Sequence, residues 1–99
     1  RMLRVRVDLD HAIALAPQNA YLYYDRANLY ASQGEYTNAI DDYTRAISLD
    51  AYLAEAYFNR GVAYVKNGNR SAGISDLSRA GELGIYNAYS VIKQVSTSK

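Results

Sequence analysis

The 99-residue sequence contains no cysteine and no tryptophan, and only one proline and one histidine. Without cysteine the chain has no disulfide, thiolate metal site, iron–sulfur cluster or cysteine nucleophile. The single histidine, His11, has no second histidine for a metal site and no serine in a recognisable elbow, so we expect a solvated surface residue. The composition leaves the compartment open, with the cytoplasm slightly favoured.

The sequence also lacks a long apolar run and an excess of either charge. No stretch approaches the roughly 18 consecutive apolar residues of a membrane span, and eleven basic side chains oppose ten acidic ones. A protein that coats nucleic acid or an anionic membrane needs a concentrated positive field. We therefore expect neither as a partner. The first residue is Arg1 rather than methionine, and we expect the chain to be a piece of a longer or processed polypeptide.

Catalytic constellations are missing as well, because no glycine-rich phosphate loop and no nucleophile with a neighbouring base occur in the sequence. Asp41 and Asp42 are adjacent, but successive residues of a helix point about 100° apart. We expect Asp41 to pair with Arg45, four residues later, on the helix surface. The sequence thus predicts a protein that is not an enzyme and has no metal or cofactor.

What the sequence has in excess is tyrosine, with eleven residues against one phenylalanine, and the tyrosines recur. When the chain is shifted by 34 residues, residues 20–53 are identical to residues 54–87 at eleven positions, among them Tyr23/Tyr57 and Gly34/Gly68. A fixed period of this length is typical of stacked repeat proteins, so the repeat decides the fold class.

Each copy predicts two helices joined by a tight turn. In the first copy Tyr23, Ala27 and Tyr30 recur at helical spacing, and a second apolar run of the same period begins at Ala39. Gly34 lies between the runs, where a residue without a Cβ atom caps a helix at positive φ. Small residues alternate with large aromatic ones, which predicts closely packed antiparallel helices with tyrosine rings beside them.

These residues and their period resemble the tetratricopeptide repeat over about residues 8–92. The first copy reads Tyr23, Arg26, Ala27, Tyr30, Gly34, Tyr36, Ala39, Tyr43 and Ala46, and the second reads Tyr57, Arg60, Gly61, Tyr64, Gly68, Gly73, Leu77 and Ala80. The closing proline of the family is replaced by Ala51 and Ile85. Gly73 and Gly81 are expected to weaken their helix, each by about 1 kcal/mol relative to alanine.

The resemblance implies an all-α, right-handed α-α superhelix with two full repeats plus flanking single helices. In this interpretation residues 1–99 form one domain. Its parts are the second helix of a partial repeat at 3–16, full repeats at 20–53 and 54–87, and a closing helix at 87–97.

The start of the chain is the one ambiguous segment. Leu3, Val5 and Val7 alternate with charged residues, which is strand periodicity, but the repeat register favours a helix. That helix lacks a partner of its own, so we expect Leu9 and Ile13 to be partly exposed, either as the cut edge of a longer array or as a dimer contact.

In such a stack the first helix of each pair lines a concave wall, and residues there that the core does not use are candidates for binding a peptide. Exposed rings beside amide side chains suit an extended chain, since they give contact area and hydrogen bonds to its backbone. The predicted peptide-binding residues are Tyr21, Tyr24, Asn28, Phe58, Asn59, Val62, Lys66, Tyr89 and Lys93.

Some members of the family hold the C-terminal carboxylate of a partner with two lysines, two asparagines and a further base. Asn28 and Asn59 match the asparagines and Lys93 matches the last base, but Tyr24 and Tyr89 replace the two lysines. Losing two cations weakens the grip on an acidic tail, so binding of a heat-shock chaperone tail is not predicted. Asn28 and Asn59 either contact a peptide backbone or are solvated.

An arginine recurs at the same position of both repeats. Arg26 and Arg60 stand where the family usually has leucine, and we expect each stem to lie along a helix and the guanidinium to bind a carboxylate or carbonyl.

The leading function is a non-enzymatic module that binds a protein or peptide in its groove. The alternatives are a structural segment or homodimer through the N-terminal helix, and an accessory domain of an enzyme.

Overall fold

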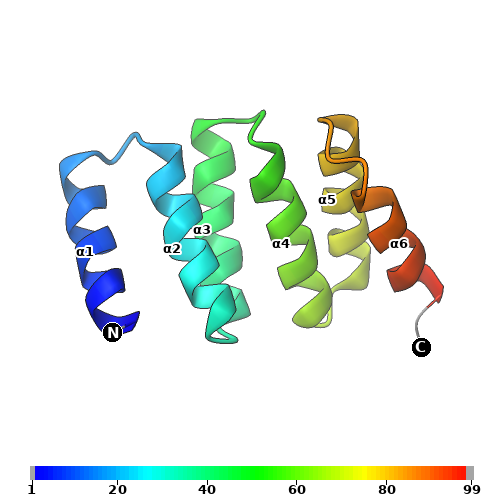
Figure 1. Ribbon diagram of the computed structural model, residues 1–99, viewed down its shortest axis with the longest axis horizontal. Helices are drawn as coiled ribbons and strands as arrows, with labels where there is room; N and C mark the ends of the chain where they lie inside the picture. Colours follow the sequence, from blue (N-terminus) through cyan, green and yellow to red (C-terminus); the bar gives the residue numbers. More distant parts are fainter. Residues whose placement is uncertain (1, 98–99) are drawn as a thin grey trace.

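Six α-helices stand side by side in one row and alternate in direction (Figure 1). The computed structural model describes residues 2–97. The helices are α1 (Met2–Leu15), α2 (Ala20–Ser32), α3 (Tyr36–Leu49), α4 (Ala54–Lys66), α5 (Arg70–Glu82) and α6 (Ala88–Thr97). No strand occurs among these residues, so the prediction of an all-α solenoid of helix hairpins is confirmed.

Glycines at the repeat period end the first helix of each hairpin. Gly34 and Gly68 have φ values of 77° and 90°, which only glycine adopts without strain. The residue after each glycine donates its backbone N–H to a carbonyl five positions back, from Glu35 to Tyr30 at 2.9 Å in the first hairpin. This bond satisfies a carbonyl that the end of the helix leaves without a partner, so both hairpins turn in the same way.

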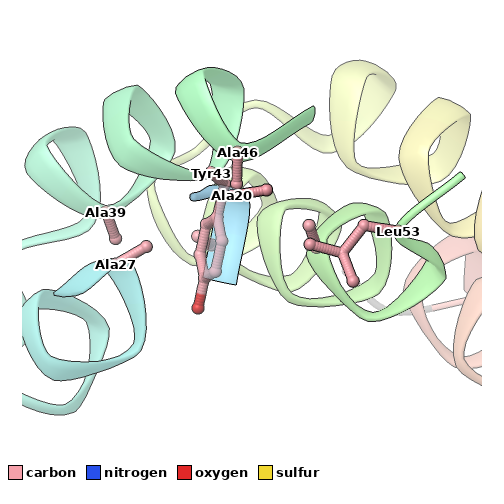
Figure 2. Close-up of a cluster of buried hydrophobic side chains, with 8 residues drawn as sticks. Ala20, Ala27, Ala39, Tyr43, Ala46 and Leu53 are labelled. Carbon is pink, nitrogen blue, oxygen red and sulfur yellow. The ribbon is translucent and has the colours of Figure 1, made fainter. Parts of the chain in front are cut away.

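Small residues allow the helices of each hairpin to approach closely. Ala27 of α2 and Ala39 of α3 are completely buried against each other (Figure 2). The second hairpin goes further: a Cβ atom on Gly73 would lie 2.7 Å from the Gly61 carbonyl oxygen and 2.5 Å from Cγ2 of Val65. Gly73 therefore costs helix propensity, as expected, but it also permits a contact that any side chain would block.

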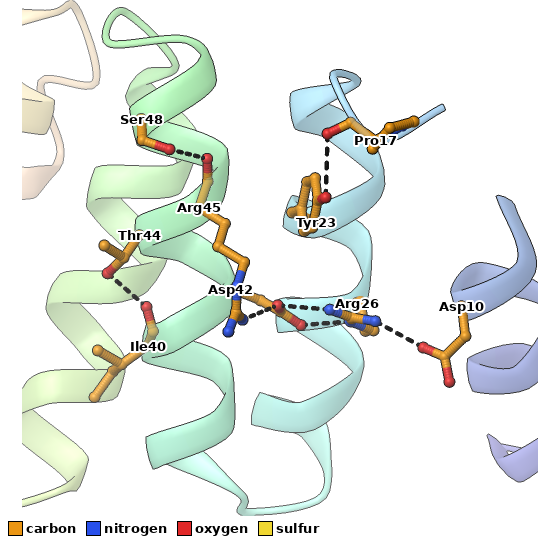
Figure 3. Close-up of polar contacts among 9 residues, drawn as sticks. All are labelled: Asp10, Pro17, Tyr23, Arg26, Ile40, Asp42, Thr44, Arg45 and Ser48. Atoms are coloured by element: carbon orange, nitrogen blue, oxygen red, sulfur yellow. Dashed lines mark hydrogen bonds and ion pairs between the residues drawn. The ribbon is translucent and has the colours of Figure 1, made fainter. Parts of the chain in front are cut away.

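An arginine of α2 joins three successive helices. Arg26 donates from Nε and Nη2 to both carboxylate oxygens of Asp42 in α3, at 2.7 and 2.9 Å, and from Nη1 to Asp10 in α1 at 2.8 Å (Figure 3). Asp42 is almost completely buried, and its carboxylate raises the pKa of Arg26. The guanidinium therefore binds a carboxylate, one of the two kinds of partner that the sequence predicted.

The same arrangement recurs one repeat later. Arg60 of α4 binds Asp76 of α5 at 2.7 and 2.8 Å and donates to Oγ1 of Thr44 in α3 at 3.1 Å. The predicted pair between Asp41 and Arg45 is wrong. Arg45 instead binds Asp42, at 2.7 Å, because residues three apart are neighbours on a helix surface just as residues four apart are.

Helix α1 packs on α2. Leu9 is partly exposed, as expected, but Ile13 is only 9% exposed, so the expected partial exposure of Ile13 is wrong. The strand-like alternation forms no strand, because α1 is helical from Met2 onward. Its large exposed apolar residues are Met2, Leu3, Val5, Val7 and Leu15.

Two further properties hold for the part of the chain that the structure describes. None of its helices is long and apolar enough to cross a membrane. No group of three or more histidine or acidic side chains within residues 2–97 is placed to hold a metal ion.

Candidate functional site

A hollow of about 370 Å³ opens between α2, α3 and α4. Its walls are mostly apolar, with amide, hydroxyl and ammonium groups at a few points. The lining residues are Asn28, Ala31, Ser32, Tyr36, Tyr43, Phe58, Asn59, Val62, Ala63 and Lys66. A volume of this size is within the range of about 300 to 1,000 Å³ that is usual for ligand pockets.

Both asparagines of the hollow belong to one hydrogen-bonded cluster. Asn59 donates from Nδ2 to the Tyr24 hydroxyl at 3.0 Å and to Oδ1 of Asn28 at 3.1 Å. The Tyr43 hydroxyl donates to the same Asn28 oxygen. These contacts use the oxygen of Asn28 and the nitrogen of Asn59. Among residues 2–97 the Asn28 nitrogen and the Asn59 oxygen have no side-chain or backbone partner.

The aromatic rings hold this cluster in position. Tyr43 is 1% exposed, and its ring centroid lies 5.9 Å from that of Tyr24. Tyr21 meets Tyr24 edge to face with centroids 6.5 Å apart. Burial raises the pKa of the Tyr43 hydroxyl, because the phenolate would lose its hydration. Tyr43 therefore remains a neutral hydrogen-bond donor, and the asparagine pair is fixed before any ligand arrives.

Charge in the hollow comes from one residue. Lys66 lies in the last turn of α4 and is exposed. Within residues 2–97 it forms no ion pair. The nearest acidic residue on the same face of α4 is Glu55, eleven residues earlier and about 16 Å away along the helix axis. The Lys66 ammonium therefore remains available to a carboxylate of a ligand.

The structure brings together part of the predicted site. Five predicted residues line the hollow: Asn28, Phe58, Asn59, Val62 and Lys66. Tyr24 lies behind them in the hydrogen-bonded cluster, and Tyr21 is exposed beside it.

The two predicted residues of α6 lie apart from the hollow. Lys93 is exposed and does not line it. Tyr89 packs its ring on Gly81 of α5, so closely that a Cβ atom on that glycine would lie 2.5 Å from Cζ of the ring. Tyr89 therefore serves the contact between α5 and α6 with at least one face.

The predicted site did not include Tyr36 or Tyr43, two lining residues of the hollow. Tyr43 does pack, but its hydroxyl reaches the asparagine cluster in the wall of the hollow. The signal that could have found it is chemical, since a buried tyrosine hydroxyl needs a partner. In the second repeat the position of Tyr43 is occupied by Leu77, which cannot form such a cluster.

Models of known families match most of the chain. Two tetratricopeptide repeat models match residues 9–41 and 54–83, and a TPR repeat model matches residues 27–68. No curated protein sequence matches.

Solved structures with the same fold are numerous. The first TPR of Spaghetti (RPAP3), bound to the HSP90 peptide SRMEEVD, is 22% identical with a TM-score of 0.91 over 96% of this chain and 77% of that one. The second TPR domain of human RPAP3, in complex with the HSP70 peptide SGPTIEEVD, is 26% identical with a TM-score of 0.90 over 98% and 82%. A crystal structure of MamA protein is 31% identical with a TM-score of 0.79 over 89% and 48%.

Proposed function

Because this chain belongs to the tetratricopeptide repeat family, we propose that it is a non-enzymatic interaction module that binds a peptide segment of a partner protein. The observation that carries the proposal is the hollow of about 370 Å³ between α2, α3 and α4. A concave, mostly apolar site with a few convergent polar groups is the usual form of a binding pocket. Tyr36 and Lys66, which line the hollow and are at least partly exposed, offer polar groups to a ligand.

The asparagine cluster suits a peptide backbone. The nitrogen of Asn28 has donors to offer and the oxygen of Asn59 has an acceptor site to offer, since their other amide atoms are used within the cluster. A peptide group carries one donor and one acceptor. An extended segment that crosses the hollow therefore finds partners for both, while its side chains contact Phe58 and Val62.

The comparisons support the same function. The Spaghetti and human RPAP3 domains have nearly the same fold and hold peptides in their structures. The hollow of the present chain lies between the first helices of its two hairpins, α2 and α4. Which peptide this chain binds is a separate question, since the printed peptides belong to the two RPAP3 domains.

The proposal is tested by filling the hollow. Ser32 lines it from the exposed last turn of α2, so Ser32→Phe places a ring in the binding space without disturbing the core. Ser48→Phe is the matched control, because Ser48 is equally exposed on α3 and also donates to a carbonyl three residues back. Affinity capture followed by mass spectrometry should lose its partners with S32F and keep them with S48F. Equal capture by both variants would contradict the groove as the binding site.

A second candidate function, self-assembly through α1, has an observation of its own. Leu3, Val7 and Ala14 form an exposed apolar stripe along α1. The corresponding positions of the two full repeats are all polar and exposed, namely Thr37, Asp41 and Ser48 in α3 and Ser71, Ser75 and Glu82 in α5. Since α3 and α5 have helices on both sides, a neighbouring repeat leaves these positions uncovered, and the apolar stripe of α1 needs another explanation.

Sedimentation velocity tests this second candidate. If the stripe joins two copies, the chain forms a dimer that dissociates when Leu3 and Val7 are both changed to serine. The control changes Leu15, an equally exposed residue outside the stripe, to serine and keeps the dimer. A chain that stays monomeric at millimolar concentration rules the candidate out.

A further inference from the structure

Resting on the proposed function, we infer that the hollow between α2 and α4 takes an internal segment of a partner protein, with an apolar side chain close in sequence to an Asp or Glu. A free C-terminal carboxylate is not what this site is built to hold. The inference comes from three properties of the hollow: its apolar floor, its one positive charge, and the way its amides are already used.

The floor selects an apolar side chain. Ala31 and Ala63 are small, and Phe58 and Val62 border the space between them together with the rings of Tyr36 and Tyr43. These groups offer dispersion contacts and exclude water. They offer few hydrogen bonds. A leucine or phenylalanine side chain of the ligand fits this surface, whereas a polar side chain would lose hydration without compensation.

The charge selects an acidic neighbour. Lys66 is the only ionised group that lines the hollow, and within residues 2–97 no carboxylate pairs with it. Glu55 lies at the other end of the same helix face, so it compensates little of this charge across about 16 Å. A carboxylate beside the apolar anchor therefore gains attraction, and a lysine or arginine at the same place is repelled.

The hydrogen-bonded asparagine cluster disfavours the C-terminal carboxylate of a peptide. A C-terminal carboxylate accepts hydrogen bonds and donates none, and it is best held by several converging cations. Here Tyr24 stands beside the asparagines and its hydroxyl already accepts a bond from Asn59. The remaining Asn59 oxygen is an acceptor that would repel a carboxylate. An internal peptide group offers it an N–H, so an uninterrupted backbone fits.

A peptide panel tests the inference by backbone amide NMR titration of the chain. The probes are seven-residue Gly/Ser peptides, acetylated and amidated, that contain one Phe and one Glu with one, two or three residues between them, in both orders. Each has three matched forms: Glu→Gln, Phe→Ala, and the same sequence with a free C-terminal carboxylate. We expect shifts in α2 and α4 around the hollow, about two- to fivefold weaker binding for the Gln form, and about tenfold weaker binding for the Ala form. Amidation should change the affinity less than twofold.

Variants of the chain test whether Lys66 is the group that recognises the carboxylate of the peptide. Lys66→Gln should bring the affinity for the Glu peptide down to that for the Gln peptide and leave the Gln peptide unaffected. Arg70→Gln is the matched control, because Arg70 is an exposed cation four residues away that lines a different hollow. It should leave the preference for Glu intact, which excludes a general effect of net charge.

The outcomes separate this inference from the proposed function. Equal binding of the Glu and Gln forms, or a gain of tenfold or more from a free carboxylate, overturns the inference while the groove remains a peptide site. Shifts confined to residues outside α2, α3 and α4 overturn both. A panel in which no peptide perturbs the hollow at millimolar concentration also overturns both.

Discussion

At the scale of single residues, two arginines link successive helices of the stack. Arg26 and Arg60 each hold a buried aspartate of the next helix in a two-point contact and also reach back to the preceding helix. Both aspartates, Asp42 and Asp76, are largely inaccessible to solvent. A buried ion pair of this kind adds little compared with apolar residues, but removal of one partner leaves a charge without compensation.

The change Asp42→Asn is therefore expected to lower the free energy of unfolding by about 3 kcal/mol. It leaves the guanidinium of Arg26 with a neutral partner in a partly buried place and also releases Arg45. Urea unfolding followed by far-UV circular dichroism measures the effect. Asp41→Asn is the neighbouring control, since Asp41 is exposed, and it should change the stability by less than about 0.5 kcal/mol. Equal effects of the two variants would show that the pair adds nothing beyond a surface contact.

Tyr43 makes the stability depend on pH in the alkaline range. Burial raises the pKa of its hydroxyl above the ordinary value of 10.0, so the folded chain binds this proton more tightly than the unfolded chain. The stabilisation is complete below pH 10 and is lost as the pH rises from there toward the raised pKa. Tyr43→Phe should flatten this decline and cost about 1 kcal/mol at neutral pH, because the hydrogen bond to Asn28 is lost.

Urea unfolding at neutral and alkaline pH measures both effects of Tyr43→Phe. Tyr52→Phe is the control, because Tyr52 is 76% exposed, and it should keep the alkaline decline of the unchanged chain. If both variants decline alike, the pH dependence comes from other groups.

At the scale of helices, the distance between the two members of a hairpin is set by a single position on each. Ala27 meets Ala39 in the first hairpin, and Gly61 meets Gly73 in the second. The residues occupy the same places in the 34-residue period. The second hairpin is the tighter one, since an added Cβ atom has no room there.

We therefore expect Gly73→Ala to destabilise the chain although alanine is the better helix former. The gain in helix propensity is about 1 kcal/mol, but the new Cβ atom would lie 2.5 Å from Val65 and 2.7 Å from the Gly61 carbonyl oxygen. Backbone cannot move aside as an exposed side chain can, so a net loss of about 1 to 3 kcal/mol is expected in thermal or urea unfolding. Ser71→Ala, at an exposed position of the same helix, should be neutral or slightly stabilising. A stabilised Gly73→Ala variant would show that the hairpin opens without cost.

At the scale of the whole molecule, the row of helices makes stability uneven from the centre to the ends. Four residues are buried in each of α3 and α4, whereas α1 buries only Ile13 and α6 only Ala88. In a stack where each unit contacts only its neighbours, the end units have half of the stabilising interfaces. The four inner helices, with two to five buried residues each, are thus held more firmly than α1 and α6.

Hydrogen exchange should reproduce this gradient. Amide protons of α1 and α6 are expected to exchange at least roughly tenfold faster than those of α3 and α4, because local opening of an end helix exposes less apolar surface. Measurement of protection factors by NMR for all six helices checks this directly. Equal protection throughout would mean that the chain opens as one cooperative unit.

The sequence by itself determined the architecture, because a repeat of 34 residues specifies the fold. The matched positions from Tyr23 to Leu83, the helical spacing of small and large residues and the turn glycines Gly34 and Gly68 are all local or strictly periodic signals. Each acts through the backbone or through a neighbour three, four or 34 residues away, so it can be recognised without coordinates. For each arginine the sequence left a carboxylate or a carbonyl as the partner, and the structure shows the carboxylate.

Only the tertiary structure decided which of the inner residues form a site. Whether Asn28 faces solvent or Tyr43, and whether Tyr89 faces the groove or Gly81, depends on rotamers and on distances between helices that no spacing records. The same holds for Arg45, since Asp42 and Asp41, three and four residues earlier, are both its neighbours on the helix surface and only the structure shows that it binds Asp42. A period places residues on a face of a helix, but the contacts across helices choose among them, since each polar group takes the partner that compensates its lost hydration best.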